Sequence, residues 1–229
     1  MKKYKLNITP FLNTQLEPLK SASGNLYPLY YRLVYQRKST MIKSISGEYF
    51  KDIEDEKAQL VITEEVKEIE GLAQYLTDFF TQSMELSGFK EKYIKAQELV
   101  KAILDQDIRN KIRLGLEKVT NPIKAIINTS DTIEDYPLEL LLEGLEKLFT
   151  KKELDLAISK ASIEMTIYHF LDLAHEGSFA EKKVIAFLNA EIIDKKFLFS
   201  LRKEFEKEQA MFLYEELITL LTTYITKAE

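Results

Sequence analysis

The chain has 229 residues, of which 45% are hydrophobic and 30% are charged, and its formal net charge is -5. It contains no Cys and only two His, which excludes disulfides, thiolate catalysis, Cys-ligated metal sites and a three-His metal site within one chain. The hydrophobic fraction is too high for a disordered protein. Few Gly and Pro, with abundant Glu, Lys, Leu and Ile, favour helix. We expect an α+β fold that is mostly α.

The charge is unevenly distributed along the chain. Residues 1–44 contain eight Lys and Arg and one Glu, a net charge of +7, which leaves -12 for residues 45–229. Such asymmetry indicates a surface for a polyanion or an acidic partner, although a short basic arm can also simply be solvated. We therefore expect a basic β-arm over residues 1–45, an acidic linker over 46–62 and an acidic helical domain over 63–229.

The N-terminal segment predicts a small antiparallel sheet of about three strands. Residues 3–11 form a candidate first strand, and residues 21–25 form a turn in which Gly24 is free to adopt a positive φ. Two extended runs, 26–35 and 40–45, flank the polar residues 36–39 and predict a β-hairpin. Alternation places one set of side chains on one face, namely Leu29, Tyr31, Leu33 and Tyr35, and a second set on the other, namely Tyr30, Arg32 and Val34.

The rest of the chain has helical periodicity. The expected helices cover residues 63–86, 89–104, 106–119, 138–149, 150–174 and 178–193, and a long C-terminal helix covers 196–226. No apolar run approaches the ~18 residues that span a bilayer, and no apolar stretch follows the basic start as in a signal peptide. We expect no membrane partner and a cytoplasmic location.

Candidate chemistry is sparse. His169, Asp172 and His175 form the only cluster of metal-ligating residue types, but the two His are six residues apart, about 600° around a helix, and do not share a face. The common nucleotide-binding glycine loops and the Gly-x-Ser-x-Gly motif are absent. We expect no catalytic residue, metal or cofactor, and no enzyme, although an enzyme of unknown type is a third alternative to the two functions given below.

Residues 23–40 read Ser-Gly-Asn-Leu-Tyr-Pro-Leu-Tyr-Tyr-Arg-Leu-Val-Tyr-Gln-Arg-Lys-Ser-Thr. With the Lys-rich start, this segment resembles the arm-type DNA-binding module of tyrosine recombinases, the integrases of phages and mobile elements. The resemblance covers residues 3–45, a fifth of the chain. The family's catalytic His-x-x-Arg is absent, because Phe-Leu-Asp follows His169 and Glu-Gly-Ser follows His175. The resemblance therefore implies DNA binding without recombinase catalysis.

The resemblance also implies which residues bind. Arg32 would contact a base or a phosphate, and Tyr30 would serve as core, platform or contact. Four further cations would hold the DNA backbone, namely Lys20, Arg37, Lys38 and Lys43. If six such charges engage, the affinity should fall with log salt at a slope of about -5.

Two functions follow from this pattern. The first is a non-catalytic DNA-binding or DNA-associated protein of a phage or mobile element, which grips duplex DNA through the hairpin in the cytoplasm of the bacterial host. The alternative is a phage virion structural protein, such as a head–tail connector or ring subunit. In that alternative, the helical domain and the N-terminal arm assemble a homo-oligomer, and the basic arm meets an acidic protein neighbour or packaged DNA.

Overall fold

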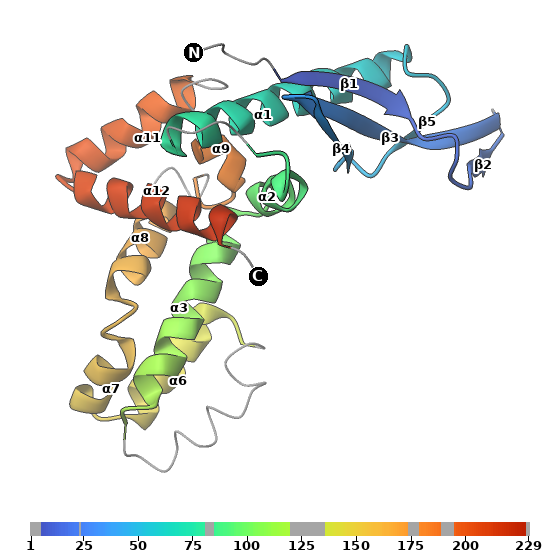
Figure 1. Ribbon diagram of the computed structural model, residues 1–229. Helices are drawn as coiled ribbons and strands as arrows, with labels where there is room; N and C mark the ends of the chain where they lie inside the picture. Colours follow the sequence, from blue (N-terminus) through green and yellow to red (C-terminus); the bar gives the residue numbers. More distant parts are fainter. Residues whose placement is uncertain are drawn as a thin grey trace. The chain divides into compact units, whose positions relative to one another are not determined.

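The computed structural model describes residues 6–22, 24–80, 85–119, 136–173, 179–188 and 195–227 (Figure 1). It confirms an α+β fold that is mostly α, with an N-terminal antiparallel sheet followed by helices. The elements form two compact units. Unit 1 comprises residues 1–97, 184–198 and 222–229, and unit 2 comprises 98–183 and 199–221.

The sheet of unit 1 is built around one long strand. Its strands are β1 (Asn7–Leu12), β2 (Leu19–Ser21), β3 (Gly24–Tyr35), β4 (Lys38–Lys43) and β5 (Tyr49–Phe50). β3 pairs antiparallel with each of the other four. β1 and β4 lie on either side of its second half, so that β1, β3 and β4 form a three-stranded ribbon.

The predicted alternation along β3 is confirmed. Leu29, Tyr31 and Leu33 are fully buried, and Ile42 of β4, opposite Tyr31, is 1% exposed. Arg32, between two of these residues, is exposed. A strand that buries every second side chain has one face in the core and one in water.

The sheet differs from the prediction in three places. β1 begins at Asn7, and the predicted start of this strand, residues 3–5, lies outside the described residues. Residues 21–25 are more than a connecting turn, because β2 folds back and pairs with the start of β3. Gly24 adopts a φ of 118°, as expected of a residue needed for a positive φ. Five strands form where about three were predicted, since short pairings such as β5 with β3 have little sequence signature.

The helices of unit 1 include α1 (Glu56–Phe80), α2 (Phe89–Ala96) and α9 (Val184–Leu188). α1 starts at Glu56 rather than at Thr63, because Asp55 Oδ1 accepts a hydrogen bond from the backbone N–H of Lys57 at 3.0 Å, as an N-cap does. The segment predicted as a linker therefore contains β5 and the start of α1. The C-terminal residues of unit 1 pack on these helices: Tyr75 Oη and Thr222 Oγ1 share a hydrogen bond of 2.6 Å.

Unit 2 contains α3 (Val100–Leu116), α6 (Leu138–Leu148), α7 (Lys151–Ile158) and α8 (Ser162–Leu173). α6 matches the prediction. The helix predicted over 150–174 is divided into α7 and α8. The boundary predicted near residue 105, between helices over 89–104 and 106–119, lies instead at residues 97–99, between α2 and α3. Parts of three predicted helices lie outside the described residues, namely 81–84 of the helix over 63–86, residue 174 of the helix over 150–174, and 178 and 189–193 of the helix over 178–193. Within the described part of the chain, no helix combines the length and apolar character required to cross a membrane.

The prediction of a single long C-terminal helix over residues 196–226 is wrong. The structure has α11 (Lys195–Lys207) and α12 (Met211–Thr226). Gln209 adopts a φ of 53°, its N–H donates to Glu206 O at 3.1 Å, and the N–H of Ala210 donates to Phe205 O at 2.8 Å. This pattern is a Schellman motif, and the buried Phe205 and Ala210 supply the hydrophobic contact that accompanies it.

Candidate nucleic-acid interface

One side of the β1–β3–β4 ribbon faces away from the core. We call it the open face and define it by Thr9, Phe11, Tyr30, Arg32, Met41 and Lys43. Tyr30 lies between Phe11 on β1 and Lys43 on β4, and Arg32 lies between Thr9 and Met41. Directly opposed residues of paired strands point to the same side of a sheet, so these six side chains form two adjacent rows.

The open face combines exposed cations with an aromatic pair. Arg32 and Lys43 are exposed, and Met41 is 58% exposed. Phe11 and Tyr30 are half-buried, with ring centroids 6.0 Å apart and planes tilted by 37°. Two positive charges therefore stand beside an aromatic surface on a sheet whose other side is fixed in the core.

The hairpin tip, Gln36–Lys38, has an unusual backbone. Gln36 and Arg37 form a two-residue loop with φ values of 50° and 65°. Two successive positive φ values are those of a type I′ turn, which normally selects Asn and Gly. Holding other residues there costs on the order of 1 kcal/mol each, and such strain often marks a functional position. The tip presents the exposed cations Arg37 and Lys38.

The predicted site residues do not form one patch. Tyr30, Arg32 and Lys43 share the open face. Lys38 opposes Tyr35, which lies on the same face of β3 as the buried Leu33. The side chain of Lys38 therefore points to the side of the ribbon opposite to the open face. Lys20 on β2 opposes Asn25. From Asn25 to Tyr35 the strand rises roughly 33 Å, which separates Lys20 from the tip.

The end of β4 is held on α1 by a buried carboxylate. Glu65 is 5% exposed, and its Oε1 accepts hydrogen bonds from Ser44 Oγ at 2.9 Å, Ile45 N at 3.1 Å and Ser46 N at 3.0 Å. These contacts fix the start of the segment that runs from β4 back to α1.

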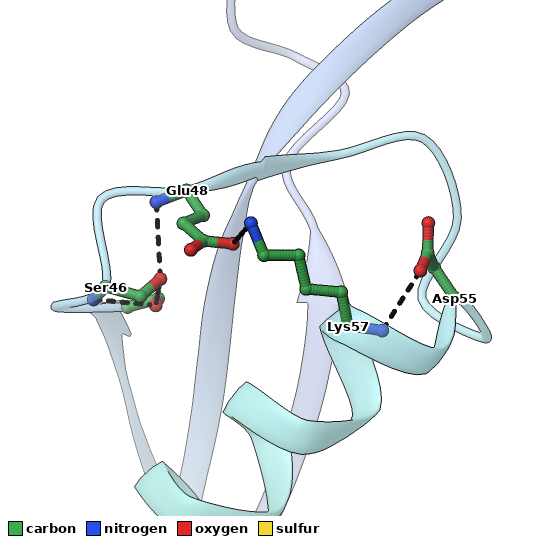
Figure 2. Close-up of polar contacts among 5 residues, drawn as sticks. Ser46, Glu48, Asp55 and Lys57 are labelled. Atoms are coloured by element: carbon green, nitrogen blue, oxygen red, sulfur yellow. Dashed lines mark hydrogen bonds and ion pairs between the residues drawn. The ribbon is translucent and has the colours of Figure 1, made fainter.

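A second contact holds the other end of the same segment. Lys57 Nζ on α1 forms an ion pair of 3.0 Å with Glu48 Oε2, beside the Asp55 cap (Figure 2). The backbone N–H of Glu48 in turn donates to Ser46 Oγ at 3.2 Å. The Lys57 side chain is 70% exposed, so this ion pair contributes little stability. The main attachment of the end of β4 to α1 is the buried Glu65.

Two tyrosines complete the polar interior of unit 1. Burial, followed by the negative charge of Glu65, raises the pKa of Tyr31 and of Tyr93 well above the ordinary value of 10.0. Tyr93 Oη donates to Glu68 Oε2 at 3.5 Å, and Gln97 Nε2 donates to the same oxygen at 2.9 Å. Both hydroxyls therefore stay protonated at neutral pH. The hydrogen bonds to Glu68 join α2 and Gln97 to α1.

The structure describes only part of the cluster formed by His169, Asp172 and His175. Asp172 Oδ1 accepts a hydrogen bond and ion pair from Lys101 Nζ at 3.3 Å, and His175 lies outside the described residues. Among the residues that are described, no three His, Asp or Glu side chains are placed to hold one metal ion.

Phe11 and Met41 belong to the open face but were missed by the sequence reasoning. Alternation along β1 gave a signal for Phe11. Ile8 opposes the buried Leu33, and Phe11 lies three residues later, so its side chain points to the other side of the strand. Its partner could not be known without the register. Comparison with protein-family models, with curated proteins and with solved structures finds no match to this chain.

Proposed function

We propose that this protein binds duplex DNA, without catalysis, through the open face and the hairpin tip. The observation that carries the proposal is that Arg32 and Lys43 flank the Phe11–Tyr30 pair on the exposed side of a ribbon whose other side is core. β-Ribbons and small sheets are established readers of DNA grooves. The major groove, ~12 Å wide, admits a two-stranded ribbon.

Each cation has a distinct role in this proposal. Arg32 lies in the middle of the open face, where its guanidinium can make paired hydrogen bonds to a guanine edge or to a phosphate. Lys43 and the tip cations Arg37 and Lys38 neutralise phosphates, which supplies affinity that is independent of sequence. The rigid attachment of the ribbon to α1 fixes the spacing of these charges before DNA arrives.

The origin and location of the protein belong to the same proposal. The resemblance of residues 3–45 to the arm-type module of tyrosine recombinases supports a protein of a phage or mobile element. Such a protein acts on DNA in the cytoplasm of the bacterial host. The acidic helical part, which contains residues 63–229, is then free to recruit protein partners or further copies.

The test is titration of a fluorescent duplex followed by anisotropy over a range of salt. If the four cations of the open face and the tip engage, namely Arg32, Arg37, Lys38 and Lys43, log affinity falls with log salt at a slope of about -3.6. The variant Arg32→Ala/Arg37→Ala/Lys38→Ala is expected to bind about tenfold or more weakly, with a slope shallower by about 3.

The matched control removes three exposed cations from the α7 region, Lys151→Ala/Lys152→Ala/Lys160→Ala. It changes the net charge equally and is expected to retain the affinity. Absence of binding by the unchanged protein at low salt, or equal losses in the two triple variants, would refute the proposal.

A further inference from the structure

Unit 2 carries a groove of about 270 Å³ between α6, α7 and α8. Its apolar lining consists of Leu142, Leu154, Ile158 and Met165, and its polar lining consists of Glu139, Glu143, Glu146 and His169. We call this feature the acidic groove. Among the residues that the structure describes, no Lys or Arg lines it, although Lys147 Nζ forms an exposed ion pair of 3.7 Å with Glu143 Oε2.

The carboxylates are arranged along one face of α6. Glu139, Glu143 and Glu146 are spaced at i, i+4 and i+7, which places them one above the other on the helix. Glu143 and Glu146 are exposed. An acidic edge over an apolar floor therefore faces solvent.

The position and charge of Glu139 are fixed by its neighbours. Tyr168 Oη donates a hydrogen bond to Glu139 Oε1 at 3.0 Å. A hydrogen bond from its own backbone N–H, followed by the one from Tyr168, lowers the pKa of Glu139, so this carboxylate is ionised at neutral pH. Burial, followed by the hydrogen bond to Glu139, raises the pKa of Tyr168 to about 12, so Tyr168 remains a donor.

This chemistry fits a segment that presents neighbouring Lys and Arg side chains. The aliphatic stems of Lys and Arg pack on an apolar floor while their charged ends reach carboxylates. The ribbon of unit 1 supplies such a segment. Arg37 and Lys38 are adjacent at its tip, and both are exposed.

We propose that the acidic groove of one copy of this chain receives the hairpin tip of a second copy. Charge complementarity argues for this occupant, because residues 1–44 carry a net charge of +7 and the groove is lined by carboxylates. Both surfaces belong to the same chain, so they are always present in equal amounts. The two surfaces differ, so the contact is heterologous. It propagates as a chain of copies unless the rotation between them closes a ring. A closed ring is the assembly that the virion alternative requires.

The inference shares the hairpin tip with the proposed function but does not depend on DNA binding. If both hold, duplex DNA and the acidic groove compete for Arg37 and Lys38, and added duplex dissociates the assembly. Self-association is therefore measured without DNA, and DNA binding is measured separately on a groove variant. Either proposal can then fail while the other stands.

The test is sedimentation velocity of the full chain at rising concentration. The unchanged protein is expected to gain mass at low ionic strength and to lose that gain between about 0.05 M and about 0.5 M salt, since the contact is electrostatic. Glu143→Lys/Glu146→Lys in the groove and Arg37→Glu/Lys38→Glu at the tip should each lower the association constant about tenfold or more, because attractive pairs become repulsive. The control Glu215→Lys/Glu216→Lys, at exposed positions of α12, should retain association.

Mixing the two charge-reversed variants gives the decisive measurement. The tip variant keeps an intact groove, and the groove variant keeps an intact tip, so the mixture should form a 1:1 dimer and no larger species. Circular dichroism should show both variants folded, because all four substituted residues are exposed. An unchanged protein that stays monomeric at low salt, or a mixture that stays monomeric although both variants are folded, would overturn the inference.

Discussion

Gly115 on α3 lies directly against the backbone of Ala157 on α7. A Cβ atom added at Gly115 would be 1.9 Å from the carbonyl oxygen of Ala157 and 2.8 Å from its Cα. Both residues are buried. The close approach therefore depends on the missing side chain, and the neighbour that would have to move is backbone rather than a flexible side chain.

Gly115→Ala is expected to destabilise unit 2 despite the higher helix propensity of Ala. Overpacking of a core contact typically costs 1–3 kcal/mol, and about 2–4 kcal/mol is expected here because the clash is with backbone. Gly144→Ala in α6 is the matched control, since a Cβ there meets nothing within 4 Å. It should stabilise by about 0.5–1 kcal/mol. Urea unfolding of the two variants should shift in opposite directions; a shift in the same direction would contradict the packing described.

Arg37→Gly should stabilise the protein while weakening DNA binding. Gly adopts the positive φ of the tip without strain, which should add about 1 kcal/mol to the free energy of unfolding. The substitution also removes one of the proposed phosphate contacts, so the salt slope should become shallower by about 1. Gln36→Gly is the control, because it relieves the same kind of strain without removing charge. Unchanged binding in Arg37→Gly would place the DNA contact elsewhere.

Arg32→Ala should weaken DNA binding more than Lys20→Ala. Arg32 stands on the open face, and Lys20 lies on β2 at the other end of β3. We expect a loss of about 1–3 kcal/mol of binding free energy for Arg32→Ala if its guanidinium pairs with a base edge. Anisotropy titrations of the two single variants at one salt concentration make the comparison. Equal losses would indicate a site that extends along the whole of β3.

Stability should fall at alkaline pH because of Tyr31 and Tyr93. Their pKa values are raised in the folded state, chiefly by burial, whereas in the unfolded chain they titrate near the ordinary value of 10.0. Above that pH the unfolded state loses protons that the folded state keeps, so the stabilising contribution is complete below pH ~10 and declines as pH rises. Urea unfolding between about pH 9 and pH 11 should show this decline, and Tyr31→Phe should reduce its slope. A slope unchanged by Tyr31→Phe would exclude Tyr31 as a source of the decline. Tyr49→Phe, at an exposed position of β5, is the control.

The arrangement of the hairpin could be predicted from the sequence because it depends on local rules. Leu29, Tyr31 and Leu33 alternate with Arg32, and a period of two assigns them to opposite faces whatever the rest of the chain does. Met41 could not be assigned to the open face, because its place depends on the register of β4 against β3. Alternation along β1 indicates which side of the strand carries Phe11, but not that Phe11 lies opposite Tyr30.

The divisions between helices could not be predicted for a related reason. The break before α3 contains no Pro or Gly. It coincides with a pairing to a distant segment, in which the N–H of Val100 donates to Lys182 O at 2.9 Å and that of Lys101 to Ala180 O at 3.0 Å. The acidic groove is likewise formed by three helices. The sequence around the α6 carboxylates therefore does not indicate which apolar side chains of α7 and α8 lie beside them.

The hydrogen bond between Tyr75 and Thr222 also bears on how the protein folds during its synthesis. The two residues are 147 positions apart, yet both belong to unit 1. At the ribosomal rate of about 5–20 residues per second, roughly 7–30 s separate their translation. The β3–β4 hairpin, by contrast, is closed by two residues and can form within microseconds. The basic ribbon can thus form early, while the hydrogen bond between Tyr75 of α1 and Thr222 cannot form until Thr222 has left the ribosome.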